Sequence, residues 1–156
     1  MSKLKDRKAI SPVIATVILV AVAITIAVAV AYWMGGISSQ YTKFEKVEVQ
    51  SGVCTYNTTD TSWKLTLKLK NTGTATATLN SAFINDVEIA HYNLNLASPS
   101  STSTNMTTST QILSGASKSV NIYVDNGYAS LSSGTTVNLK IHSAGGMDYI
   151  KLIELV

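Results

Sequence analysis

The sequence predicts an α+β chain in which one long, hydrophobic N-terminal helix is followed by an antiparallel, immunoglobulin-like β-sandwich. Two observations predict this class. From Ile10 to Met34 there is no charged side chain and the composition is mostly apolar. From Lys43 onward, apolar and polar residues alternate with a period of two. We therefore expect a charged leader over residues 1–9, a hydrophobic helix over residues 10–42 and a β domain over residues 43–156.

The apolar segment is long enough to cross a membrane. A helix of 25 residues, from Ile10 to Met34, extends for about 37 Å, whereas a hydrocarbon core measures about 30 Å. Ser11-Pro12 forms a suitable helix start, and Tyr32-Trp33 lies where an interfacial aromatic belt is expected. Gly35-Gly36 indicates a flexible break or the helix end.

Small residues recur along this helix at a spacing of four. The predicted helix-packing positions are Ala21, Ala23, Ala27, Ala29 and Ala31. Residues four apart share one helix face, and small side chains there let two helices approach closely. The same spacing also arises by chance in a segment rich in Ala and Val.

The charges predict the orientation of the chain. Four cations, Lys3, Lys5, Arg7 and Lys8, precede the apolar segment, and none lies between it and Lys43. The positive-inside rule places the N-terminus in the cytoplasm and the β domain outside. From Lys43 onward eight lysines balance eight acidic residues. This neutral body argues against electrostatic binding of nucleic acid.

Three interpretations of the N-terminus fit these features. A pilin-type signal would be cut between Ala9 and Ile10, which removes the charges and leaves the helix on the mature protein. An ordinary secretory signal would be cut after Ala29-Val30-Ala31, although about 20 apolar residues precede that site, against about 7–15 in a typical signal. In the third interpretation the helix is an uncleaved single-pass anchor.

The residues KAISPVIATVILVAVAI favour the first interpretation, because they resemble the N-termini of archaeal type IV pilins over residues 8–33. The resemblance implies that Lys8 and Ala9 are the recognition and cleavage residues of a prepilin-type peptidase and that Ile10 becomes the N-terminus. The I-S-P start is similar to adhesive pili rather than to archaellins. Ile14 stands where bacterial pilins carry a glutamate, so filament register would rest on apolar packing.

The β domain shows its clearest alternation over residues 63–70, where four apolar side chains share one face. We predict further strands over residues 43–49, 76–84, 86–91, 118–124, 135–142 and 147–155. Turns are predicted at residues 71–73, 125–127 and 144–146. About seven or eight short strands are typical of a sandwich.

Hydroxyl side chains dominate one stretch of this domain. Ten of the 13 residues from Ser98 to Thr110 are Ser or Thr, which predicts a loop. The loop either carries O-linked sugars or is simply solvated. Asn57 and Asn105 begin N-x-Thr sequons and are candidate N-glycosylation sites. We expect at least one of them to carry a glycan.

The sequence lacks the motifs of catalytic and metal sites. It contains no C-x-x-C, H-E-x-x-H, G-x-S-x-G or phosphate-binding glycine motif. His91 and His142 stand alone near predicted strand ends, and Cys54 is the only cysteine. We expect Cys54 to be a small half-buried residue, the alternative being a disulfide between chains. The sequence therefore predicts no enzyme, no metal and no cofactor.

The resemblance implies a structural subunit of an archaeal adhesive pilus that polymerises through its helix after leader cleavage. Its partners would be copies of itself, the prepilin peptidase, the assembly machinery and, for the precursor, the cytoplasmic membrane. The mature chain would lie in an extracellular filament. A rival interpretation is a membrane-anchored or secreted β-sandwich binding module that does not polymerise. Another is a tethered hydrolase, which requires a pocket with convergent titratable groups.

Overall fold

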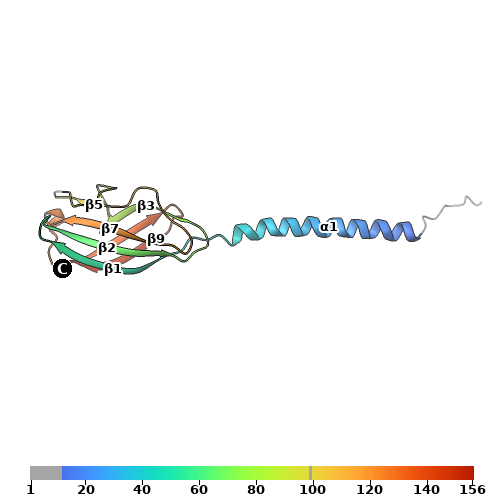
Figure 1. Ribbon diagram of the computed structural model, residues 1–156, viewed down its shortest axis with the longest axis horizontal. Helices are drawn as coiled ribbons and strands as arrows, with labels where there is room; N and C mark the ends of the chain where they lie inside the picture. Colours follow the sequence, from blue (N-terminus) through green and yellow to red (C-terminus); the bar gives the residue numbers. More distant parts are fainter. Residues whose placement is uncertain (1–11, 99) are drawn as a thin grey trace, which may run out of the picture. The chain divides into compact units, whose positions relative to one another are not determined.

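A computed structural model of the chain describes residues 12–98 and 100–156. The chain divides into two units, residues 1–42 and residues 43–156. The described residues of the first form one helix, and those of the second form two antiparallel sheets (Figure 1). The predicted class, a long apolar helix followed by an antiparallel sandwich, is confirmed.

Helix α1 spans Pro12–Tyr41. The prediction that Gly35-Gly36 breaks or ends the helix is wrong, since α1 continues through both glycines. A glycine inside a helix costs only about 1 kcal/mol relative to alanine, and the residues after it propagate the helix. The Ser39 hydroxyl also donates to the carbonyl of Gly36 at 2.9 Å.

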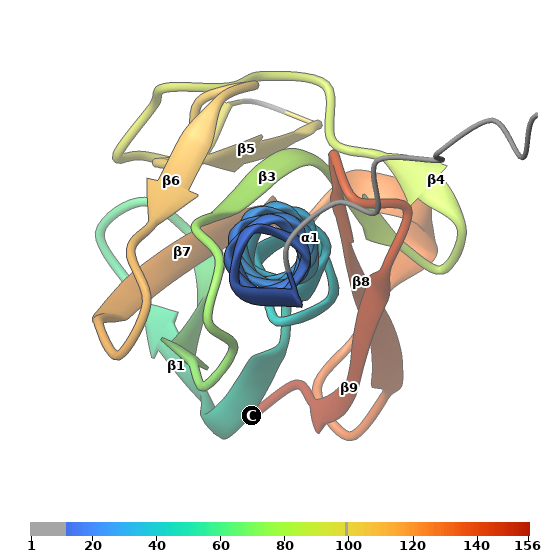
Figure 2. The same cartoon turned by 90° about the vertical axis from the view of Figure 1, so that its right-hand side faces the viewer.

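The body contains two sheets that face each other. One sheet has the order β1-β2-β7-β5, and the other has the order β4-β3-β8-β9, with β6 pairing β3. Figure 2 shows β1 and β7 on the opposite side of the body from β8 and β9. The strands are β1 (Val47–Asn57), β2 (Ser62–Asn71), β3 (Ala77–Ile84), β4 (Val87–Glu88), β5 (Thr102–Thr104), β6 (Thr110–Ile112), β7 (Ser117–Asp125), β8 (Thr136–Ser143) and β9 (Asp148–Glu154); a 3-10 turn covers Tyr128–Ser130.

The core lies between the sheets and follows from the alternation. On β2 the inward side chains of Trp63, Leu65, Leu67 and Leu69 are at most 2% exposed, as the sequence predicts. On β3 the buried positions change from Leu79 to Ala82 because the pairing with β8 shifts there. An extra residue in one strand reverses which side chains face inward.

Three predicted segments differ from the structure. The strand predicted over residues 43–49 begins at Val47 and continues to Asn57. The strand predicted over residues 86–91 is reduced to β4. The stretch from Ser98 to Thr110, predicted to be a loop, contains the buried strand β5.

Strand β5 is buried because its hydroxyl groups find partners inside the body. The Thr104 hydroxyl donates to the carbonyl of Asn121 at 2.8 Å, and the Ser103 hydroxyl donates to the carbonyl of Leu96. A buried polar group costs little once it is hydrogen-bonded. Composition alone therefore predicts a solvated loop where the fold has an internal strand.

The start of the body is fixed to the turn after β2. The carbonyl of Lys46 accepts hydrogen bonds from the N–H groups of Thr72 and Gly73, at 2.8 and 3.1 Å. The carbonyl of Phe44 accepts two more from Thr74 and Ala75, both at 3.0 Å. Hydrogen bonds therefore connect the first residues of the body, from Phe44 onward, to the turn at residues 72–75.

Gly73 makes this close backbone contact feasible. A Cβ atom at Gly73 would lie 2.5 Å from the oxygen of Phe44 and 2.6 Å from the nitrogen of Lys46. The buried side chain of Asn71 holds the same turn, because its amide donates to the carbonyls of Ala75 and Ile112 at 2.8 and 2.9 Å.

We predict that Gly73→Ala lowers the free energy of unfolding of the body by about 1–3 kcal/mol, because the new methyl group meets backbone atoms. Thermal unfolding of the full chain in detergent, followed by the β-sheet circular dichroism signal, measures the change. Gly145→Ala is the matched control, since its Cβ would meet the end of the flexible Glu45 side chain. Equal losses in both variants would show that the contact at Gly73 has no special role.

Candidate functional site

The principal candidate site is the surface of α1. No residue of this helix is buried, and none carries a charge. Large apolar side chains are exposed all around it, among them Val13 at 69%, Val17 at 62% and Leu19 at 70%. A helix that is apolar on every face requires an apolar environment. By length and composition α1 could also cross a membrane.

The polar side chains within the apolar part of α1 bond to the helix itself. The hydroxyl of Thr16 donates to the carbonyl of Val13, and that of Thr25 donates to the carbonyl of Ala21, both at 2.8 Å. Because these hydroxyl groups already have acceptors, they do not need water. The helix therefore suits lipid or a packed helical interior equally well.

The five alanines predicted as packing positions are all exposed on α1. Ala21 lines a surface depression, which it shares with Thr16, Val17, Val20 and Ile24. A small residue flanked by larger apolar ones can receive a side chain from a neighbouring helix. The packing role of Ala21, Ala23, Ala27, Ala29 and Ala31 stays a prediction, and the cleavage residues Lys8, Ala9 and Ile10 lie outside the described residues.

The two sequons have different environments. Asn57 is exposed at the end of β1, and its side-chain oxygen accepts a hydrogen bond from the N–H of Thr59 at 3.0 Å. Asn105 is partly buried, and its side-chain oxygen accepts from the N–H of Asn121 at 2.8 Å. Met106, inside the second sequon, is 1% exposed. Asn57 is therefore the more accessible acceptor.

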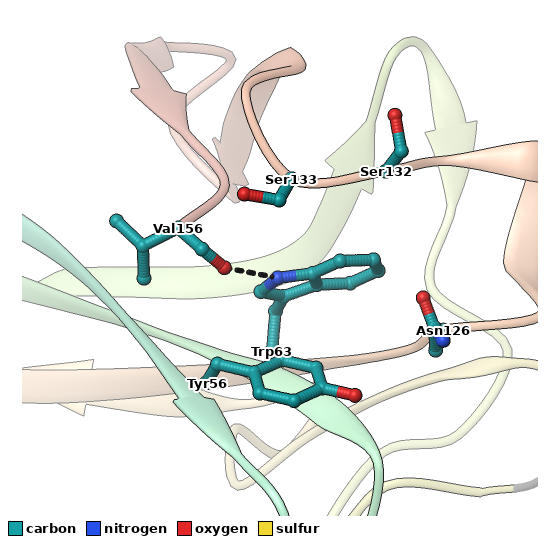
Figure 3. A pocket seen from close by; sticks show the side chains of 6 residues that line it. All are labelled: Tyr56, Trp63, Asn126, Ser132, Ser133 and Val156. Atoms are coloured by element: carbon teal, nitrogen blue, oxygen red, sulfur yellow. Dashed lines mark hydrogen bonds between the residues drawn. The ribbon is translucent and has the colours of Figure 1, made fainter.

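A pocket of about 410 Å³ lies at the end of the body away from Lys43 (Figure 3). It is lined by Tyr56, Trp63, Asn126, Ser132, Ser133 and Val156. The Trp63 indole N–H donates to the carbonyl of Val156 at 2.7 Å. Sequence analysis missed this pocket because its lining comes from separate segments. The one available signal was the short spacing of Tyr56 and Trp63 across a hairpin.

His142 and Asp148 form a pair that resembles part of a catalytic triad. His142 Nδ1 lies 2.6 Å from an Asp148 oxygen, and Ser81 is paired with His142 on the neighbouring strand. These are the residue types of a hydrolase triad, but Ser81 makes no hydrogen bond to His142 within the described chain, and neither pocket described above includes them. His91 pairs with Ser103 in an isolated bridge.

Neither metal ligands nor a reactive thiol emerge from the described part of the chain. Among residues 12–98 and 100–156, no group of three or more His, Cys, Asp or Glu side chains is placed to hold a metal. Cys54 is partly buried, and desolvation raises the pKa of its thiol. The thiol is therefore protonated near neutral pH, which makes it a poor nucleophile.

Neither a protein-family model nor a curated protein matches this sequence. Three solved structures show partial similarity to this chain. The archaellum periplasmic stator protein FlaG from Sulfolobus acidocaldarius is 16% identical, with a TM-score of 0.42, over 70% of this chain and 100% of that chain. The archaeal flagellum of Methanospirillum hungatei strain JF1 is 18% identical, with a TM-score of 0.46, over 94% of each chain.

A third similar structure is the stator protein complex of FlaF and FlaG from Sulfolobus acidocaldarius. It is 17% identical, with a TM-score of 0.42, over 70% of this chain and 90% of that chain. At these identities and TM-scores, the three similarities assign no function to this chain.

We predict that Asn57 is glycosylated and Asn105 is not, when the chain is exported by a cell that modifies N-x-Thr sequons. Intact-mass spectrometry should show that Asn57→Gln removes the glycan mass. Asn105→Gln should leave the glycan but weaken the body by about 1 kcal/mol, since the bond to the Asn121 N–H is disturbed. A bare polypeptide mass for the unmodified chain would contradict the prediction.

Proposed function

We propose that the chain is a structural subunit of an archaeal type IV adhesive pilus and polymerises through α1 after its leader is removed. One observation carries the proposal: over 30 residues α1 has no charge and no buried side chain. Such a surface is stable only when it is covered on all sides. Identical helices packed side by side would cover it.

In the precursor, membrane lipid would cover the apolar surface of α1. Its charged leader, with Lys3, Lys5, Arg7 and Lys8, would hold the N-terminus at the cytoplasmic face of the membrane. Cleavage between Ala9 and Ile10 by a prepilin-type peptidase would remove these charges. The helix could then leave the bilayer without the four leader cations, and only the new α-amino group of Ile10 would carry a positive charge.

Assembly would exchange lipid contacts for helix contacts. Burial of one Val, Leu or Ile side chain contributes about 1.5–3 kcal/mol relative to water, but lipid already covers these side chains, so the net gain comes from close packing. Ala21 and the depression around it offer one place for such packing. Repeating one contact without closure produces an open filament.

The body would form the outer surface of this filament and carry its contacts with the environment. It has its own core, and formally it is neutral from Lys43 onward. We propose no enzymatic activity for it. Support comes from the His142–Asp148 pair, to which no nucleophile among residues 12–98 and 100–156 is hydrogen-bonded, and from the desolvated thiol of Cys54.

A second candidate function is a membrane-anchored binding module that does not polymerise. The pocket beside Tyr56 and Trp63 favours it, because ligands bind in concave, mostly apolar sites with a few polar groups. This alternative needs α1 only as an anchor, so changes in the packing surface of α1 separate the two functions.

We predict that Val17→Asp combined with Val20→Asp abolishes surface fibres while the body still folds. Both side chains are more than half exposed and line the depression on α1, so the carboxylates would be buried in a helical core. Electron microscopy of sheared fibres measures the loss. Val53→Asp, at an exposed position of the body, is the control and should leave fibres intact.

The carboxylates could also disturb membrane insertion, so a second variant keeps the helix apolar. Ala21→Leu with Ala29→Leu should leave the precursor in the membrane but reduce the number of fibres, because larger side chains prevent close approach. Normal fibres from both double variants would contradict polymerisation through α1.

A further inference from the structure

We propose that the pocket at the end of the body away from Lys43 binds a neutral carbohydrate. It is formed by the ends of β1, β7 and β9, the start of β2 and the loop before β8. The proposal does not depend on polymerisation, because every residue that lines the pocket belongs to the body.

The floor of the pocket consists of two aromatic rings. Tyr56 and Trp63 are directly opposite each other on β1 and β2, and their ring centroids lie 5.6 Å apart at an interplanar angle of 55°. Trp63 is nearly covered at 2% exposure, whereas Tyr56 is 40% exposed. Tyr56 thus offers an aromatic surface to a ligand, and Trp63 supports it from the core.

The Trp63 ring is held in one position. Its only polar atom, the indole nitrogen, donates to the carbonyl of Val156 at 2.7 Å (Figure 3). The bond occupies the only donor of this side chain. The fixed ring of Trp63 holds the ring of Tyr56 from behind, and the exposed part of the Tyr56 ring suits the C–H faces of a sugar ring.

The rim of the pocket supplies neutral polar groups. The side chains of Asn126 and Ser133 are exposed and make no hydrogen bond within the described chain. Ser132 shares only a 3.3 Å contact with the hydroxyl of Thr135. Together, an amide and two hydroxyl groups provide donors and acceptors that match the hydroxyl groups of a sugar.

The charge and size of the pocket indicate which class of ligand it can bind. None of the six lining side chains is charged, so the pocket lacks the cationic side chains that bind phosphates or carboxylates. Its volume of about 410 Å³ lies at the small end of the range for ligand pockets, about 300–1,000 Å³. A monosaccharide or disaccharide unit fits this combination.

The test uses the full chain in a detergent that has no sugar head group. Trp33→Phe leaves Trp63 as the only tryptophan, since the chain has two, so its fluorescence reports on the pocket. The probes are glucose, N-acetylglucosamine, maltose and cellobiose, with glycerol as the control. We expect a saturable fluorescence change for at least one sugar at about millimolar concentration and none for glycerol.

Two substitutions of Tyr56 assign the response to the pocket. Tyr56→Phe keeps the ring and should bind with nearly unchanged affinity, whereas Tyr56→Ala should weaken binding about tenfold. The thermal unfolding midpoint shows whether each variant is folded. Equal affinity in the two variants would overturn the proposal, as would binding of indole or p-cresol without any response to the sugars.

The sugar could come from outside or from a glycan carried by a copy of this chain, since Asn57 lies next to Tyr56. Protein with the Asn57 glycan and the Asn57→Gln variant are compared in the same titration. Weaker binding of free sugar to the glycosylated form identifies the glycan as the occupant, and equal binding identifies an external sugar. Either result supports the pocket as a carbohydrate site.

Discussion

One constraint governs the whole chain: the apolar surface of α1 has to be covered. Most apolar helices of globular proteins expose one side to water, but α1 has large apolar side chains all around and no charge over 30 residues. The hydroxyl groups of Thr16 and Thr25, within its apolar part, bond to its own carbonyls. The apolar part of the helix, up to Met34, has no side chain that favours contact with water, so its stability has to come from lipid or from other helices.

In contrast to α1, the body buries its apolar side chains in a core of its own. Leu65, Leu67 and Leu139, together with other inward side chains of both sheets, are fully buried. The first residues of the body are fastened at Phe44 and Lys46 to the turn at Gly73. The chain thus changes, within a few residues after Tyr41, from a helix that needs partners to a sandwich that needs none. A filament subunit requires this division.

The sequence predicted those features whose physical cause is local. The alternation at Trp63–Lys70 and the apolar run after Ile10 each reveal an element without knowledge of the rest of the chain. Strand β5 was missed, because burial of its hydroxyl groups depends on carbonyls such as that of Asn121, which lies distant in sequence. The helix was expected over residues 10–42 and ends at Tyr41, but Gly35-Gly36 was wrongly interpreted as a break or end, because the cost of two glycines is small beside the gain from a continuing helix.

The pocket could not be predicted for a similar reason. Tyr56 and Trp63 face each other only because of the register between β1 and β2, and Asn126 and Ser132 join them only through the fold. In contrast, the proposed cleavage site at Lys8, Ala9 and Ile10 rests on the sequence alone, and it lies outside the described residues.

The N-terminus of the protein sheared from the cell surface tests the central claim most directly. Mass spectrometry of the sedimentable fibre fraction should find a chain that begins at Ile10, with the whole of α1 retained among copies of itself. A soluble chain that begins at Tyr32 would mean that the helix is discarded and the body is secreted. A chain that begins at Met1 or Ser2 and stays with the membrane would mean that α1 is only an anchor, and either result would contradict the account.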